Sequence, residues 1–188
     1  MRISELGALE IISHEAIILN RYHDTKGIWT IGVGVTDQAG ASIKPSVFKG
    51  EITVDEAFTM FVDLLPQYER FVHKLLDNAE VCIEDIKQHE YDALVSLAWN
   101  VGSIITIKSK TRGTRARISR GDIAGAIDLW RADKELKSRR DKEVALARTG
   151  EYKSKTVRIA NAGEWGEVLW GTSRRVRLSR FIGKGVWS

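Results

Sequence analysis

The segment from Glu15 to Thr36 constrains the fold most, because its pattern indicates two strands joined by a tight turn. Residues 17–19 are apolar, residues 24–27 read Asp-Thr-Lys-Gly, and residues 28–35 form a second apolar run. Turn-forming residues between such runs favour a hairpin. In the returning strand, alternate side chains lie on opposite faces. One face holds Trp29, Ile31, Val33 and Val35, and the other holds Thr30, Gly32 and Gly34.

The second of these faces is almost bare backbone. Gly32 and Gly34 would leave the main chain open, so that a bulky ligand could approach it closely. Two acids, Glu15 and Asp24, flank the same hairpin. A sugar polymer suits such a surface, and we expect Gly32 and Gly34 to contact it.

The two acids have different predicted surroundings. Glu15 ends an amphipathic segment that begins near Ser4, and residues 16–19 after it are apolar, which favours the protonated form of a carboxyl. Asp24 lies in a polar turn and should stay ionised. Glycoside hydrolysis needs such a pair, one acid to protonate the leaving oxygen and one carboxylate to direct water or stabilise the oxocarbenium charge. The alternative interpretation is a solvated charge and a turn-former.

The order Glu15, Asp24 and Thr30, with Thr30 opening the sequence Thr-Ile-Gly-Val-Gly, resembles the catalytic signature of the phage-type lysozyme and endolysin group, glycoside hydrolase family 24. Three later segments are similar to helices of that family: Gln88 to Gly102, Gly121 to Ile127 and Ser138 to Gly150. There are two departures. Ala16 stands where the family usually has Gly, and Val35 stands where it often has His. Neither removes a chemical group of the triad.

The resemblance implies a mostly helical α+β fold, lysozyme-like, with a small hairpin lobe at about residues 14–50, a larger helical lobe and an active-site cleft between them. It covers a catalytic domain at residues 1–152 and leaves residues 153–188 as a C-terminal extension. It implies a muramidase that hydrolyses the β-1,4 bond between N-acetylmuramic acid and N-acetylglucosamine in peptidoglycan, in the role of a phage or prophage endolysin. Inversion of configuration is the outcome it favours.

Each residue of the triad then has a role. Glu15 would protonate the glycosidic oxygen. Asp24 would position or activate the attacking water, or stabilise positive charge at the anomeric carbon. Thr30 would hold that water through its hydroxyl group.

Asn100 and Arg139 are further candidates. Asn100 precedes Val-Gly at the predicted end of a helix, where it is either a substrate contact or part of a C-terminal cap with Gly102 in the left-handed conformation. Arg139 corresponds in the resemblance to a basic residue that ion-pairs with the catalytic Glu15. Its alternative is a solvated arginine on a charged helix face beside Arg140.

Two further segments have predicted conformations. Thr53 and Glu56 have the spacing of a capping box and predict a helix over the following apolar positions, which Pro66 would kink or divide. The basic run from Lys108 to Arg120 is predicted to be a loop.

The positive charge is concentrated at the C-terminus. Eight basic and three acidic residues give residues 151–188 a net charge of +5, so residues 1–150 carry −1 of the total of +4. The same segment holds Trp165, Trp170 and Trp187. Cations interleaved with aromatics could bind an anionic bacterial envelope. Alternatively, the extension packs its tryptophans onto the helical lobe.

The composition limits the ligands and partners that we expect for this chain. The single cysteine, Cys82, excludes an intrachain disulfide, and the four histidines lack zinc-ligand spacing, so we expect no metal and no cofactor. No nucleic-acid signature is present, and we expect a monomer. Without a signal peptide or an apolar run of eighteen residues, we expect synthesis in the host cytoplasm and release to the wall through a holin pore.

Two rival functions remain open at this stage. One is a catalytically silent peptidoglycan-binding or scaffolding domain that keeps the fold, against which the complete triad of Glu15, Asp24 and Thr30 argues. The other is a lytic transglycosylase, which cleaves the same bond with a single acid and no water, and the presence of Asp24 argues against it.

Overall fold

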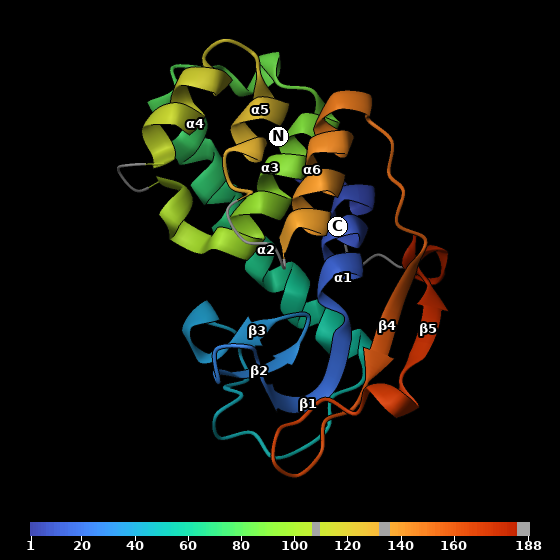
Figure 1. Ribbon diagram of the computed structural model, residues 1–188. Coiled ribbons are helices and arrows are strands. Elements are labelled where there is room, and N and C mark those ends of the chain that lie inside the picture. Colours follow the sequence, from blue (N-terminus) through green and yellow to red (C-terminus); the bar gives the residue numbers. More distant parts are fainter. Residues whose placement is uncertain (107–109, 132–135, 184–188) are drawn as a thin grey trace. The chain divides into compact units, whose positions relative to one another are not determined.

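The computed structural model describes residues 1–106, 110–131 and 136–183. Figure 1 labels its main elements. The helices are α1 (Glu5–Glu15), α2 (Val54–Asn78), α3 (Gln88–Val101), α4 (Lys110–Ile118), α5 (Ile123–Asp128) and α6 (Lys137–Thr149). The strands are β1 (Ile17–His23), β2 (Trp29–Gly32), β3 (Val35–Thr36), β4 (Thr156–Ala160) and β5 (Arg174–Arg177). Five short 3-10 turns are also described: Asp37–Ala39, Ile83–Asp85, Gly102–Thr106, Trp170–Thr172 and Leu178–Phe181. The predicted class, mostly helical α+β, is confirmed.

The chain divides into two compact units. The first comprises Met1–Ile11 and Pro66–Lys153, and the second comprises Ile12–Leu65 and the chain from Ser154 on. The boundary in α2 falls immediately before Pro66. α2 nevertheless runs as one helix through this proline, so of the two predicted outcomes, a kink or a division, the division is wrong.

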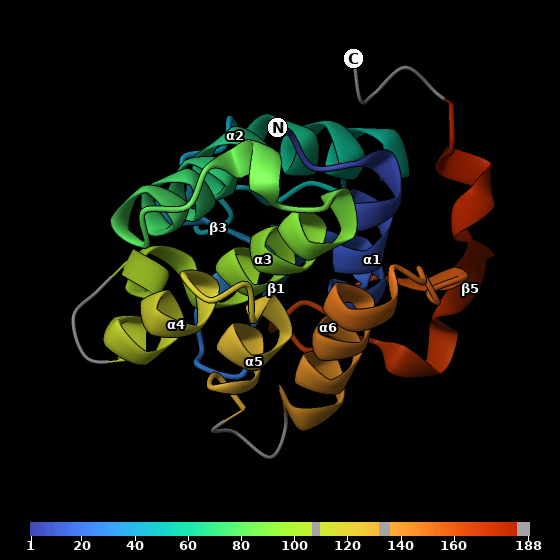
Figure 2. The ribbon, with the colours of Figure 1, turned by 90° about the horizontal axis from the view of Figure 1, so that it is seen from above.

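The first unit is helical. α3 lies against α5 and α6, and α4 lies against α5, as Figure 2 shows. The helix α3 is apolar nearly all round its middle, with Tyr91, Leu94 and Leu97 fully buried, which is the pattern of a central core helix. Gly102 ends it with φ at +62°, and its N–H donates to the carbonyl of Ala98. The run predicted as a loop from Lys108 to Arg120 is instead the helix α4 where it is described; residues 107–109 lie outside the described part.

The second unit holds a five-stranded sheet in the order β3-β2-β1-β4-β5. β1, β2 and β3 pair antiparallel, β1 and β4 pair parallel, and β4 and β5 pair antiparallel. The predicted turn closes the first hairpin, since Gly27 N–H donates to the Asp24 carbonyl at 2.9 Å. The capping box also forms: Glu56 accepts from the Thr53 N–H at 2.7 Å, and Thr53 Oγ1 accepts from the Glu56 N–H at 3.1 Å.

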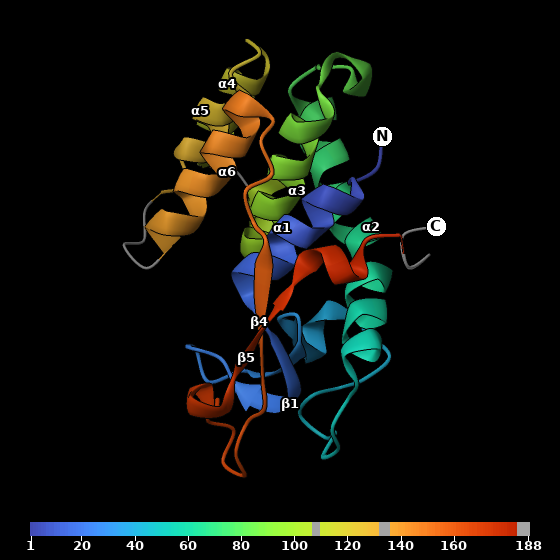
Figure 3. The same cartoon turned by 90° about the vertical axis from the view of Figure 1, so that its right-hand side faces the viewer.

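The C-terminal extension belongs to the second unit through its backbone and its aliphatic side chains. β4 lies beside β1, and β5 lies beside β4, as Figure 3 shows. Val157, Ile159, Leu178 and Phe181 are buried, and Phe181 stacks on Phe58 of α2 with ring centroids 4.2 Å apart. Trp165 and Trp170 are 81% and 44% exposed, so the extension does not pack through them. Trp187 lies outside the described residues.

Candidate functional site

Glu15 is the last residue of α1 and is half-buried. The chain turns from helix to strand at the next residue, Ala16, whose φ is +64°. This left-handed conformation costs an L-residue with a side chain about 1–2 kcal/mol and is the reason glycine suits the position. The departure from the family at this residue therefore has a structural meaning, because Ala16 adopts the backbone that a glycine would adopt without strain.

Asp24 is held by the turn that it begins. Its Oδ1 accepts hydrogen bonds from the N–H groups of Lys26 and Ile28, both at 2.8 Å. Its own N–H donates to the Ile28 carbonyl at 3.0 Å. The carboxylate is half-buried, and these bonds fix its orientation at the tip of the hairpin.

Thr30 lies opposite Tyr22 in the β1–β2 pair, so the two side chains share one face of the hairpin. Thr30 is only 2% exposed, and its hydroxyl donates to the Ile28 carbonyl at 3.0 Å. Burial raises the pKa of Tyr22 above its usual range, and the negative charges of Glu15 and Asp24 raise the pKa further. Both carboxylates thus act on one phenol, which stays protonated and can donate.

Tyr22 thus interacts with each member of the predicted triad, since it pairs with Thr30 and its pKa responds to Glu15 and Asp24. Tyr22 was not among the residues predicted from the sequence. The alternation of side chains along a strand could have indicated Tyr22, since it lies two residues before Asp24 and pairs with Thr30.

The prediction of an open strand face at Gly32 and Gly34 assumed one continuous strand, and that assumption is wrong. The chain does not continue as one strand from 28 to 35; β2 ends at Gly32, and β3 begins at Val35. Gly32 and Gly34 have φ values of +62° and +72°, which turn the chain. Gly32 is buried, and a Cβ there would lie 3.5 Å from Ala57 and Ile52. The bare strand face that motivated a contact of Gly32 and Gly34 with substrate is therefore absent. The contact itself stays a prediction.

Asn100 and Arg139 belong to a buried polar network of the helical unit. Asn100 Oδ1 accepts from Arg140 Nη2 at 2.7 Å. Arg139 Nε lies 3.0 Å from Glu143 Oε1, which also accepts from the hydroxyl of Ser96 at 2.7 Å. Arg140 pairs with the same Glu143.

The alternative prediction for Arg139, a solvated arginine on a charged helix face, is wrong, because Arg139 and Arg140 are both buried. Removing one partner of such a buried ion pair typically costs about 3–5 kcal/mol. The sequence contained a signal for these ion pairs, because Arg140 and Arg139 precede Glu143 by three and four residues, the spacing of neighbours on a helix surface. The predicted pairing of Arg139 with Glu15 stays a prediction.

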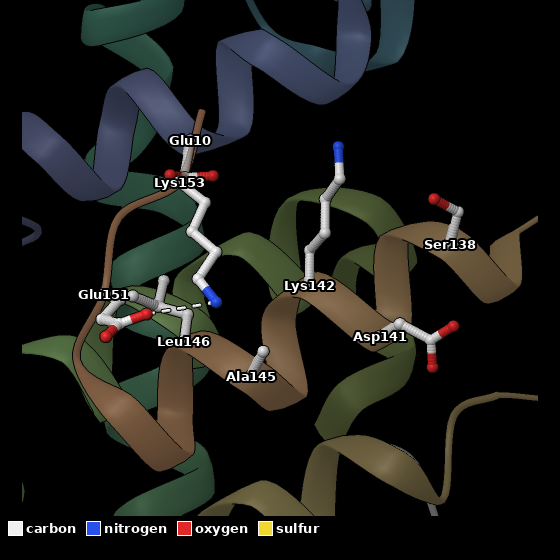
Figure 4. Close-up of a pocket in the computed structure, with 8 residues that line it drawn as sticks. All are labelled: Glu10, Ser138, Asp141, Lys142, Ala145, Leu146, Glu151 and Lys153. Atoms are coloured by element: carbon white, nitrogen blue, oxygen red, sulfur yellow. Dashed lines mark ion pairs between the residues drawn. The ribbon is translucent and has the colours of Figure 1, made fainter. Parts of the chain in front are cut away.

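A surface cavity of about 210 Å³ lies in the helical unit, and none of the predicted site residues lines it. Figure 4 shows its lining: Glu10, Ser138, Asp141, Lys142, Ala145, Leu146, Glu151 and Lys153. Lys153 Nζ and Glu151 Oε2 pair across 3.1 Å, and both side chains are largely exposed. No group of three or more metal-ligating side chains occurs within the described residues. No helix in that part of the chain is long and apolar enough to cross a membrane.

A mostly helical chain with a small mixed sheet has the fold expected of a lysozyme-like protein. A sequence model of the phage lysozyme family matches residues 12–143, and the chain belongs to this family. The resemblance read from the sequence is therefore confirmed. β4 and β5 lie beyond the matched residues.

Known relatives agree with this assignment. The SAR-endolysin of Haemophilus phage HP1 is 32% identical over 117 residues, which cover 61% of this chain and 56% of that protein. The endolysin of Salmonella phage P22 is 32% identical over 103 residues, which cover 54% of this chain and 64% of that protein. The chain thus matches less than two thirds of the length of each.

A solved structure of an endolysin from Escherichia coli O157:H7 phage FAHEc1 superposes with a TM-score of 0.68 at 25% identity. The match covers 82% of this chain and 98% of that chain.

Proposed function

We propose that this protein is a peptidoglycan muramidase that hydrolyses the β-1,4 bond between N-acetylmuramic acid and N-acetylglucosamine. The observation that supports it most is the hairpin itself, which holds Asp24 by two backbone N–H groups and places Thr30 opposite Tyr22, whose pKa is raised by the charges of Glu15 and Asp24. Membership of the phage lysozyme family supports the same reaction.

In the proposed reaction Glu15 delivers its proton to the glycosidic oxygen as the bond to the anomeric carbon breaks. The carboxylate of Asp24, held by two backbone N–H groups, stabilises the positive charge at that carbon and accepts a proton from the attacking water. Thr30 orients the water through its hydroxyl lone pairs. This route inverts the anomeric configuration, since water attacks from the face opposite the leaving sugar.

The products separate this reaction from its rivals. Purified peptidoglycan is digested with the protein, and the fragments are analysed by mass spectrometry. Hydrolysis gives reducing ends, a lytic transglycosylase gives anhydro ends, and a silent binding domain releases nothing. Proton NMR of fresh product then reports the anomer: inversion predicts the α anomer first, and β anomer at the earliest times would contradict the assigned role of Asp24.

The biological role that we propose is host lysis as an endolysin, with the protein acting as a monomer made in the host cytoplasm. Two relatives carry the name endolysin. Expression alone should leave cells intact, and expression with a holin should lyse them. Lysis without a holin would contradict this route, and light scattering of the purified protein tests the monomer.

The extension is proposed to contact the anionic envelope. Arg158 lies opposite Arg175, and Thr156 lies opposite Arg177, so three arginines share one face of the β4–β5 hairpin. Among the described residues, none of these arginines pairs with a carboxylate. Arg158 stacks on Trp170, with its guanidinium carbon 4.3 Å from the ring centroid. Like charges opposite one another are unfavourable, and an anionic surface would offset that repulsion.

A further inference from the structure

The strand β1 joins the two proposed catalytic acids, since Glu15 immediately precedes Ala16 and Asp24 follows His23. Whatever fixes β1 therefore fixes the spacing of the two carboxylates. The partner strand β2 fixes only part of β1. Ile18 pairs with Gly32, and Tyr22 pairs with Thr30, so four steps along β1 match two along β2. The middle of β1 bulges away from the regular ladder.

The C-terminal extension contacts β1 at its start, its middle and its end, while Glu51 and Ile52 pair with the backbone at Asn20 and Leu19. Ile17 and Ile18 pair with Ile159 and Ala160 of β4. In the bulge, Asn20 forms two hydrogen bonds with the backbone of Ala162: its Oδ1 accepts from the N–H at 2.7 Å, and its Nδ2 donates to the carbonyl at 3.1 Å.

The same partnership continues to the end of the strand. The N–H of His23, the residue before Asp24, donates to the Gly166 carbonyl at 2.8 Å. The extension thus holds β1 beside Glu15, at the bulge and beside Asp24.

Tyr22 is the side chain that connects this support to the acids. Its ring packs against a small cluster of Ala16, Ile18, Ala160 and Ala162, together with Val168. Three of these residues come from the extension, and Ala16 is the neighbour of Glu15. The charges that act on the phenol are those of Glu15 and Asp24. A shift of the extension would therefore move a hydrogen-bond donor relative to both carboxylates.

We propose that residues 156–168 of the extension are a positioning element for hydrolysis, which fixes β1 through Asn20 and the packing of Tyr22 and thereby holds the spacing of Glu15 and Asp24. This inference rests on the proposed muramidase function. It concerns residues beyond those that match the family, so the extension contributes to the chemistry as well as to any surface contact.

The test compares Asn20→Ala and Tyr22→Phe with a control of the same chemical change, Asn78→Ala. Asn78 is the exposed last residue of α2 and lies outside β1 and the extension. Initial rates on a soluble peptidoglycan oligosaccharide give kcat and KM across the pH range, and thermal unfolding reports the folded fraction.

We expect Asn20→Ala to lower kcat by about tenfold or more with KM within about twofold, because misplacing a catalytic group by about 1 Å can cost about a hundredfold in rate. Tyr22→Phe keeps the ring and its packing, so it should stay folded. It should change the pH profile of kcat/KM, because it removes the phenol that interacts electrostatically with both acids. Asn78→Ala should keep the kcat and the pH profile of the unaltered protein.

The inference is overturned if both variants keep the kcat and the pH profile of the unaltered protein while Glu15→Gln is inactive. If Asn20→Ala does not fold, Tyr22→Phe decides the outcome alone. An active Glu15→Gln would instead contradict the proposed function itself, so the two failures are distinguishable.

Discussion

Asn20 and Ala162 are joined by two hydrogen bonds in opposite directions, although 142 residues separate them in the sequence. At this bulge in the β1–β2 pairing, Glu51 and Ile52 pair with the backbone of β1, and the side-chain amide of Asn20 adds a link to the extension. This relationship makes the C-terminal extension a structural part of the hairpin that carries the predicted acids.

Truncation after Tyr152 is therefore expected to unfold the second unit. The truncated chain loses β4 and the four buried side chains Val157, Ile159, Leu178 and Phe181. Each buried large apolar side chain contributes about 1.5–3 kcal/mol, so the loss rivals the about 5–15 kcal/mol that stabilises a whole domain. Circular dichroism during heating measures the outcome.

A double substitution gives the control for this truncation. Trp165→Ala with Trp170→Ala keeps β4 and the buried aliphatic residues, and both tryptophans are exposed, so the melting temperature should change little. A truncated protein that melts like the full chain would show that the extension is dispensable for folding.

Ala16→Gly should be nearly neutral for stability. Relief of the strain at φ +64° offsets the lost methyl burial and the greater flexibility of an unfolded glycine, so we expect a change within about 1 kcal/mol. Ala93→Gly is the matched control, because Ala93 is fully buried in the interior of α3 and gains no such relief. It should lose about 1.5–2 kcal/mol in a denaturant titration. Equal losses at the two positions would contradict the strain at Ala16.

Thr30→Val should lower kcat by about tenfold or more while leaving the fold intact, because valine keeps the shape but loses the hydroxyl that would orient water. Thr59→Val is the control, since the Thr59 hydroxyl also donates to a backbone carbonyl, that of Asp55, at 3.0 Å. Thr30→Glu would not test the chemistry, because Thr30 is buried and a new carboxylate there would destabilise the fold. Equal rates for Thr30→Val and Thr59→Val would remove Thr30 from the mechanism.

Local features of the fold could be predicted from the sequence, and distant pairings could not. The turn at Asp24 and the capping box of Thr53 and Glu56 depend on residues within four positions of one another, so the local pattern contains them. The pairing of β1 with β4 depends on partners 142 residues apart, which no local pattern specifies. The burial of Arg140 was missed for a similar reason, because its partner Asn100 lies on another helix.

If the β4–β5 hairpin contacts the envelope, charge changes on this hairpin should weaken membrane binding more than the same changes elsewhere. Arg175→Glu with Arg177→Glu should weaken binding to phosphatidylglycerol vesicles by about 2 kcal/mol or more at low salt, since each cation near an anionic surface contributes about 1 kcal/mol. Arg112→Glu with Arg120→Glu makes the same change in net charge at exposed positions of the helical unit. Cosedimentation should distinguish the two double variants, and both should cleave soluble oligosaccharide normally. If both bind equally well, the hairpin face is not the contact.

The most direct test of the central claim is the rate at which Glu15→Gln releases reducing ends from purified peptidoglycan. The amide keeps the shape of the side chain but has no proton to deliver, so the rate should fall by about a hundredfold or more while the melting temperature stays close to that of the unaltered protein. A folded Glu15→Gln protein that keeps more than about a tenth of the rate would contradict the assignment of Glu15 as the general acid.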